Sequence, residues 1–192
     1  MNQDSITPTD EELLLAARNG DHEAFGELIK RHERRVATTV KGMLGDTPEA
    51  EDIGQETFLR LFRSLKSFRG ESKIETYLTR IAINLSINEL RRRRRHSLLS
   101  LEHDAIQGQP QTSMEPGYDR TESQEAVQKA ISSLKPKLRS VVVLRMIDGY
   151  STAETSKILR IPQGTVLSRL ARAQMKLKEI LSSFGLGERN EG

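Results

Sequence analysis

Apolar residues recur at the three- and four-residue spacing of an amphipathic helix through the first half of the chain. This pattern predicts helices over residues 11–40, 49–67 and 74–94. An Asn19-Gly20-Asp21 break divides the first of these into two helices, and Asp21 is placed to cap the second.

The periodicity stops over residues 96–121, which are rich in Gly, Pro, Gln and Ser and predict a linker. Helical spacing then resumes, and the sequence Ser151-Thr-Ala-Glu154 forms a capping box. The further helices are expected at 122–134, 137–147, from Ser151 to about 160, and 163–181. The predicted fold is therefore all-α: two small helical domains, 1–95 and 122–192, joined by a flexible linker, 96–121.

Composition restricts the class of protein. Only 35% of the residues are hydrophobic, and 5 Phe and 3 Tyr are the only aromatic side chains, so one large enzyme core is not expected. The absence of Cys excludes a disulfide framework, a thiolate nucleophile and Cys-ligated zinc. The polar, acidic N-terminal segment is no secretory signal, and no apolar run approaches the ~20 residues that span a bilayer. These features predict a cytoplasmic protein without membrane insertion.

The net charge is only +3, but the charged residues are distributed unevenly along the chain. Residues 1–90 are net acidic, residues 91–95 are five consecutive arginines, and residues 122–192 are net basic. Six basic residues and no acidic one lie between Lys157 and Lys178. Clustered cations are what a polyanion-binding surface requires, although charge runs also occur on ordinary solvated faces.

Enzyme motifs are absent from the sequence, which has no phosphate-binding loop, nucleophile elbow or H-E-x-x-H segment. The four histidines are scattered, and the acidic residues around Glu51 are better explained by a solvated or partner-binding helix face. We therefore predict no catalytic residues, no metal site and no cofactor.

The last two predicted helices and the Ile161-Pro162 turn between them have the plan of a helix-turn-helix, whose second helix enters the major groove of DNA. One face of that helix is apolar. The opposite face carries hydroxyl and cationic side chains suited to phosphates and base edges: Thr165, Ser168, Arg172 and Lys176. An ordinary wet helix face is the alternative explanation.

A second polar stripe follows the helix predicted at 74–94. Its members step by three and four residues: Tyr77, Arg80, Asn84, Asn88, Arg91 and Arg95. An aromatic ring, amides and guanidinium groups on one line are the components of a surface that binds single-stranded nucleic acid. A merely solubilising strip is the alternative.

Six motifs in order make the chain resemble the extracytoplasmic-function (ECF) sigma factors of the sigma-70 superfamily. They are Gly20-Asp21-His-Glu-Ala24-Phe25, Glu51-Asp52-Ile-Gly-Gln55-Glu56-Thr-Phe58, Tyr77-Leu78-x-x-Ile81-Ala82-x-Asn84, Leu134-Lys-Pro136-Lys-Leu-Arg139, Gly149-Tyr-Ser151-x-x-Glu154 and Pro162-Gln-Gly164-Thr165-Val166-x-Ser168-Arg169-Leu-x-Arg172-Ala173. The resemblance covers nearly the whole chain.

This resemblance implies a sigma factor that binds core RNA polymerase and directs promoter-specific initiation. It implies that Asp52, Gln55 and Glu56 bind the polymerase clamp, and that the loop 68–73 and the polar stripe open the −10 element. The −10 residues would be Phe68, Tyr77, Arg80, Asn84, Asn88 and Arg91, with Arg91–Arg95 adding backbone charge. The −35 residues would be Thr165, Ser168, Arg169, Arg172 and Lys176, Arg169 lying nearer the core edge. An anti-sigma factor is the further partner it implies.

Five positions depart from the family pattern. Tyr77 stands where Trp is frequent, Asn88 where Asp is usual, Leu167 where Lys or Arg is common, and Thr155-Ser156 where Ile-Ala is usual. Leu167 cannot donate a hydrogen bond, so it contacts a thymine methyl or nothing. The alternatives to a sigma factor are a stand-alone helix-turn-helix regulator, an adaptor that binds proteins through its acidic helix, and a hydrolase.

Overall fold

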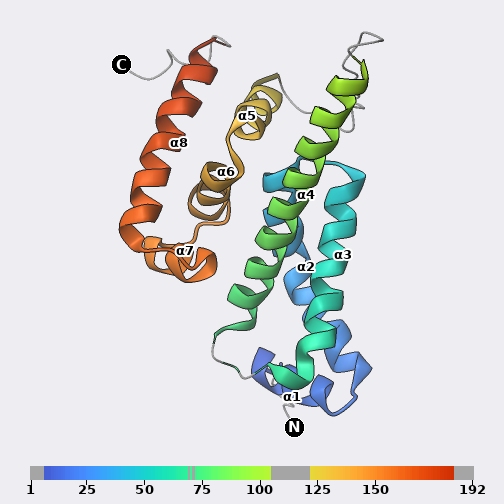
Figure 1. Ribbon diagram of the computed structural model, residues 1–192. Helices are drawn as coiled ribbons and strands as arrows, with labels where there is room; N and C mark the ends of the chain where they lie inside the picture. Colours follow the sequence, from blue (N-terminus) through green and yellow to red (C-terminus); the bar gives the residue numbers. More distant parts are fainter. Residues whose placement is uncertain (1–6, 69, 71, 105–121, 184–192) are drawn as a thin grey trace.

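A computed structural model describes residues 7–68, 70, 72–104 and 122–183 of the 192-residue chain. Every regular element in these residues is helical, as the sequence predicted (Figure 1). None of the described helices has both the length and the apolar character needed to cross a bilayer. The elements are α1 (Asp10–Arg18), α2 (His22–Leu44), α3 (Pro48–Ser64), η1 (Leu65–Ser67), α4 (Ile74–Asp104), α5 (Glu122–Ser133), α6 (Pro136–Val142), the π-helical turn η2 (Val143–Ile147), α7 (Thr152–Leu159) and α8 (Gln163–Ser183).

Several of these helices begin at the capping residues that the sequence predicted. The Asp21 carboxylate accepts a hydrogen bond from the Ala24 amide at the start of α2. At α7, Ser151 and Glu154 form the reciprocal capping box, since each side chain accepts from the other residue's backbone N–H. These short-range interactions satisfy amides that a helix cannot pair by itself.

Helix α4 is longer than predicted, and its predicted end near Arg94 is wrong. It continues to Asp104 and includes the first residues of the predicted 96–121 linker. Leucine and glutamate favour helix, and no Gly or Pro occurs in the sequence between Arg91 and Asp104, so nothing stops the helix there. The linker from residue 105, together with loop residues 69 and 71, lies outside the described residues.

The N-terminal domain packs α1, α3 and α4 around α2. The side chains of Leu28, Val40, Met43, Leu61 and Leu78 are fully buried at its centre. A second, smaller core lies in the C-terminal domain, where α5, α6, α8 and the turn between α5 and α6 contribute Ile131, Leu134, Leu138, Val142 and Ala173. Two helical domains were expected, and each has apolar residues of its own to bury.

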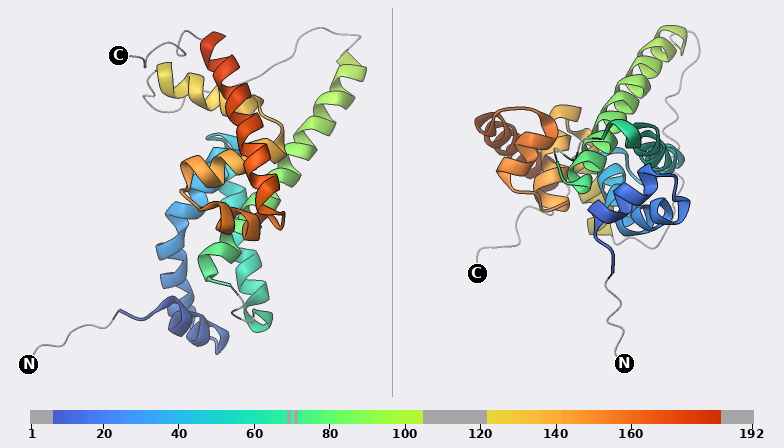
Figure 2. Two further views of the ribbon diagram at one scale, coloured as in Figure 1. Left: turned by 90° about the vertical axis from the view of Figure 1, so that its left-hand side faces the viewer. Right: turned by 90° about the horizontal axis from the view of Figure 1, so that it is seen from below.

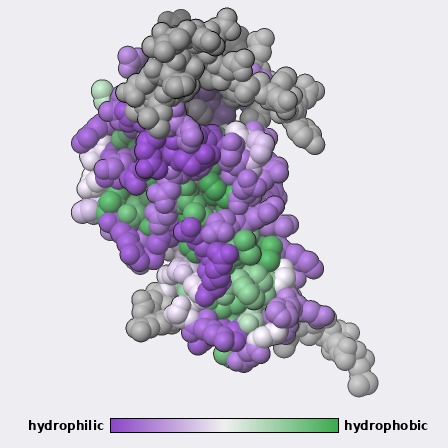
Figure 3. Space-filling model, turned by 45° about the vertical axis from the view of Figure 1, so that its right-hand side comes forward, coloured by the Kyte–Doolittle hydropathy of each residue, from purple (hydrophilic) through white to green (hydrophobic). Residues whose placement is uncertain are grey.

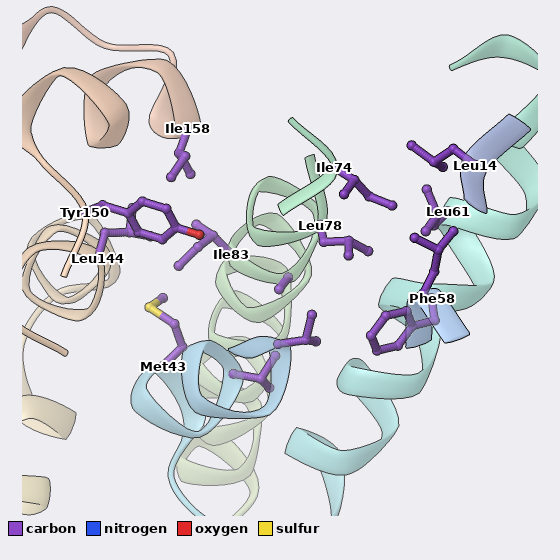
Figure 4. Close-up of a cluster of buried hydrophobic side chains, with 14 of the residues drawn as sticks. Leu14, Met43, Phe58, Leu61, Ile74, Leu78, Ile83, Leu144, Tyr150 and Ile158 are labelled. Atoms are coloured by element: carbon purple, nitrogen blue, oxygen red, sulfur yellow. The ribbon is translucent and has the colours of Figure 1, made fainter. Parts of the chain in front are cut away.

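The two domains also share a core, which the sequence did not predict. Val143, Leu144, Tyr150 and Ile158 belong to the C-terminal domain but lie in the same buried cluster as the side chains of α2 and α4. Figure 4 shows Tyr150 extending toward Ile83 of α4, with Met43 of α2 below them. The domains therefore lie side by side along α2 and α4, as the turned views of Figure 2 also show.

Two residues mark the closest approach of the domains. A Cβ added to Gly42 of α2 would lie 3.1 Å from both Val143 methyl groups, so glycine lets η2 pack directly on the helix. Nearby, the buried Arg139 donates to the Met43 carbonyl at 2.6 Å and to the carbonyls of Ser132 and Leu134. Burial lowers the pKa of Arg139 to about 10, so it remains protonated and joins the end of α2 to the C-terminal domain.

Substitutions at two glycines of α2 should separate interdomain packing from helix propensity. Gly42→Leu should lower the free energy of unfolding by about 1–3 kcal/mol, because the new side chain overlaps Val143. Gly26→Ala is the matched control, since its Cβ meets nothing within 4 Å; it should raise stability by about 1 kcal/mol through helix propensity. Urea unfolding followed by circular dichroism measures both, and an unchanged Gly42→Leu midpoint would contradict the close packing.

Candidate nucleic-acid and polymerase interfaces

The predicted site residues fall on three surfaces, one each on α3, α4 and α8. No group of histidine and carboxylate side chains in the described part of the chain could hold a metal ion.

The predicted polymerase-binding residues lie on the outer side of α3. Asp52 and Gln55 are exposed to solvent. Glu56 is half-buried, and its carboxylate accepts from Arg60 at 2.9 Å and from Arg63 at 3.5 Å. The charge of Glu56 is thus partly balanced within its own helix, whereas the carboxylate of Asp52 is open to a partner.

Two apolar side chains on the same helix were not predicted to be part of this surface. Leu59 is 49% exposed and Phe62 is 45% exposed. Phe62 packs edge-on against Phe25 at a ring-centroid distance of 5.1 Å and stacks near His22. Figure 3 shows patches of hydrophobic surface within a largely hydrophilic face on this side of the molecule. The sequence did contain a sign of this exposed apolar surface. Leu59 does not fall on the same helix face as the buried Phe58, Leu61 and Leu65.

Four of the six predicted members of the α4 polar stripe lie on an exposed face of the helix. Asn84, Asn88, Arg91 and Arg95 are all exposed. Asn88 and Arg91 line an open depression together with Arg94 and Arg95. Amide and guanidinium groups therefore face solvent side by side, where a polyanion can reach them.

The five consecutive arginines divide into two groups. Arg92 and Arg93 pair with Glu89, at 2.7 and 3.1 Å, and Arg93 also reaches Glu49 on α3 at 3.0 Å. The hydrogen bond from Arg92 is the main reason that the pKa of Glu89 is lowered. Arg91, Arg94 and Arg95 are exposed and form no ion pair with the described part of the chain.

The two predicted stacking residues are packed against each other. The rings of Phe68 and Tyr77 meet edge to face at 4.9 Å, and both are half-buried against the N-terminal core. The Tyr77 hydroxyl donates to the Ser64 Oγ at 3.1 Å. In this conformation only part of each ring is open to an incoming base.

Arg80, also predicted in the −10 surface, contacts the C-terminal domain. Its Nη2 donates to the Lys157 carbonyl of α7 at 3.3 Å. Burial lowers the pKa of Arg80, and the nearby Arg160 acts in the same direction. The arrangement therefore brings α7 against the start of the α4 stripe and engages one of its cations.

The helix-turn-helix predicted from the sequence is present as α7, a short turn and α8. Arg160 ends α7 in the left-handed conformation, with a φ of 52°, and Pro162 precedes α8. The Ser156 hydroxyl donates to the Ile161 carbonyl at 2.5 Å and so fixes the turn. Val166, Ala173 and Leu177 bury the inner face of α8, which fixes the rotation of the helix.

The outer face of α8 presents the predicted −35 residues. Ser168, Arg172 and Lys176 are exposed, and Thr165 and Arg169 are half-buried, Arg169 lying nearer the core edge as expected. None of these cations forms an ion pair with a described residue. Leu167 is 55% exposed beside them and is the apolar side chain that could contact a base methyl.

Comparisons with known proteins agree with this geometry. A family model described as Sigma-70 region 2 matches residues 28–96, and one described as Sigma-70, region 4 matches residues 124–177. The chain is 34% identical over 182 residues to the ECF RNA polymerase sigma factor SigM of Mycobacterium tuberculosis, covering 93% of this chain and 88% of that one. It is 33% identical over 176 residues to SigW of Bacillus subtilis, covering 88% and 94%.

Solved structures show the same fold. CnrH, solved in complex with the cytosolic domain of CnrY, superposes with a TM-score of 0.66 at 26% identity, over 91% of this chain and 97% of that one. The sigma factor RpoE of Bartonella quintana, solved with the anti-sigma factor NepR, gives 0.65 at 21% identity over 82% and 96%. With both conserved regions matched and relatives aligned over most of their length, the chain belongs to the ECF sigma factors of the sigma-70 superfamily, the subunits that direct promoter-specific transcription initiation.

Proposed function

We propose that this sigma factor divides its task among the three surfaces described above: α3 binds core polymerase, α4 holds the −10 element and α8 reads the −35 element. The observation that carries the proposal is the presence of two exposed surfaces with arginines that form no ion pair with a described residue, one within each matched sigma-70 region. A stand-alone helix-turn-helix regulator would use only α8 and would leave the other two surfaces without a role.

The −35 contact is proposed for the outer face of α8. Its apolar face is buried, so the helix can enter a major groove only with the face that carries Ser168, Arg172 and Lys176. Arginine can bind guanine through two hydrogen bonds or bind a phosphate, and a serine hydroxyl can serve either. Arg169 lies closer to the domain core, which favours a phosphate as its partner.

The −10 contact is proposed for α4. Extruding a base from the duplex costs a few kcal/mol, which stacking and hydrogen bonds to the base edge can offset. Asn84 and Asn88 supply amides for base edges, while Arg91, Arg94 and Arg95 supply charge for the backbone. Tyr77 and Phe68 supply the aromatic surface, and a base would reach it once their mutual packing adjusts.

The polymerase contact is proposed for the α3 surface. The exposed carboxylate of Asp52 and the amide of Gln55 lie on the same helix as Leu59 and Phe62, so polar and apolar contacts can form together. An interface that combines an apolar centre with a polar rim is the usual design of a specific protein contact.

The proposed place of action is the cytoplasm, where the polymerase and the chromosome are. A protein inhibitor of the anti-sigma type is a further proposed partner. The complex of CnrH with the cytosolic domain of CnrY supports such a partner for a chain of this fold.

The purified protein should direct run-off transcription from specific promoters when it is added to core RNA polymerase. Fragments of its own genome are the templates, and core enzyme alone is the control. Initiation at defined start sites is the expected result. If no template supports initiation while the protein still binds core polymerase, the initiation role is wrong.

Arg172→Ala should weaken binding of the holoenzyme to a −35 duplex by about 1–3 kcal/mol if Arg172 contacts a base. Lys178→Ala is the matched control, since Lys178 is an exposed cation of the same helix that lies off the outer face. Fluorescence anisotropy with a promoter found by run-off measures both variants. Equal binding by the Arg172 variant and the wild type would remove Arg172 from the interface.

Arg91→Ala and Arg92→Ala should differ in binding to a single-stranded −10 oligonucleotide. Arg91 has no carboxylate partner among the described residues, whereas Arg92 pairs with Glu89 at 2.7 Å. Loss of one phosphate contact lowers the slope of log affinity against log salt by about 0.7 for a single strand. The Arg91 variant of the holoenzyme should show this change and the Arg92 variant a smaller one; identical slopes would contradict the division of the arginines.

A further inference from the structure

A partly buried cluster of polar side chains lies in the seam between the two domains, in which Thr39 and Tyr150 are buried and Arg35 is exposed. Arg35 and Thr39 of α2 and Glu75 of α4 face Asp148 and Tyr150 of the C-terminal domain. None of these residues is needed for the proposed nucleic-acid or polymerase contacts. A buried polar group without a hydrogen-bond partner weakens a closed arrangement of this kind.

The hydrogen bonds of Thr39 depend on the protonation of Asp148. The Thr39 side chain is fully buried, and its Oγ1 lies 3.0 Å from the Arg35 carbonyl and 2.8 Å from Oδ2 of Asp148. A hydroxyl has one hydrogen and cannot donate to both oxygens. If Asp148 is a carboxylic acid, it donates to Thr39, which donates to the Arg35 carbonyl, and both contacts are satisfied.

The second carboxyl oxygen of Asp148 supports the same protonation state. Oδ1 is buried and has no hydrogen-bond partner. A carboxylate spreads its charge over both oxygens, so one buried oxygen without a donor destabilises the ionised form.

The charged groups that face Asp148 come from both domains. Arg35 of α2 favours ionisation, but its Nη1 donates to the Asp148 backbone carbonyl at 3.1 Å and its Nε pairs with Glu75 at 3.0 Å. Glu75 of α4 opposes ionisation. Arg145, on the same domain as Asp148, donates to the Tyr150 carbonyl. Burial raises the pKa of the Tyr150 hydroxyl to about 12, so this hydroxyl stays protonated near neutrality.

We propose that Asp148 is a proton-operated latch between the domains: the protonated side chain, bonded to Thr39, holds the seam closed, and its ionisation favours separation. Burial is the main cause that raises the pKa of Asp148 to about 6 in the closed form, outweighing the hydrogen bond from Thr39 and the charge of Arg35. When the domains separate, Asp148 meets water and its pKa returns toward 3.8.

The direction of the effect follows from these two states. The closed form holds its proton up to about pH 6 and the open form only to about pH 4, so closing takes up one proton between these values. The closing equilibrium constant should rise about tenfold for each pH unit lost there, or about a hundredfold in all. Above about pH 6.5 both forms are ionised and the dependence ends.

The consequence for initiation rests on the proposed function. In the closed form α7 contacts the α4 stripe through Arg80 and the Lys157 carbonyl, 3.3 Å apart. Elements centred near −10 and −35 are about 25 base pairs apart, which is about 85 Å along DNA. Helix α8 begins six residues after Lys157 and is only about 32 Å long at 1.5 Å per residue. The domains must therefore separate to occupy both elements, and an acidic cytoplasm would retain the inactive form.

Two measurements on the full chain test the latch without polymerase. The carbon-13 shift of the Asp148 carboxyl, followed by NMR, should titrate near pH 6 in the wild type. A midpoint near 4 would overturn the proposal.

The separation of the domains is measured by energy transfer between two dyes. Because the chain has no Cys, the substitutions Glu33→Cys on α2 and Gln174→Cys on α8, both at exposed sites, allow the dyes to be attached. Energy transfer should increase as the pH falls from about 7 to about 4.5.

Asp148→Asn should remove the pH dependence, because the amide donates to Thr39 at every pH and the side chain cannot ionise. The variant should show more of the closed form than the wild type at about pH 7. Glu179→Gln, which removes an exposed carboxylate of α8, is the control and should titrate as the wild type does. An unchanged profile in Asp148→Asn would overturn the proposal. Failure of run-off transcription would refute the proposed function and leave these measurements valid.

Discussion

The burial of η2, Tyr150 and α7 against α2 and α4 determines the arrangement of everything else in the molecule. Two small helical domains have little interior of their own, and only 35% of the residues are hydrophobic. Leu144 and Val143 are fully buried in a cluster that includes side chains of the N-terminal domain. The position of α8 relative to α4, and hence the relation between the two proposed DNA-binding surfaces, follows from this shared core.

Local features of the chain were predictable because short-range interactions determine them. The helical periods, the Asp21 cap and the Ser151–Glu154 capping box depend on residues three or four positions apart. The continuation of α4 was missed because polar composition was interpreted as a linker, although no helix-stopping residue precedes Asp104. The shared core could not be predicted, since an apolar helix face does not specify which other face will cover it.

For the candidate surfaces too, features that depend on local spacing were predictable, and features that depend on tertiary contacts were not. The stripe on α4 and the outer face of α8 follow from helical spacing, and the structure presents both to solvent. Spacing alone does not show which arginines of the run are paired with carboxylates. Arg93, for example, is paired with Glu49, a residue 44 positions away on α3. Likewise, Tyr77 and Phe68 are suitable for stacking by residue type, but the fold packs them against each other. Residue type and spacing predicted the candidate surface, whereas tertiary contacts determine which of its members are exposed.

The shared core also makes α4 a point of competition within one chain. Its exposed stripe is proposed to hold DNA, while the adjacent buried side, with Thr79 and Ile83, holds the C-terminal domain through Tyr150. Arg80 lies at the boundary and contacts α7. Polymerase and promoter can open the molecule only to the extent that they bind the open form more tightly than the closed one. A seam stabilised by both apolar contact and a buried carboxyl therefore sets how much binding free energy initiation must supply, and a proton can alter that amount.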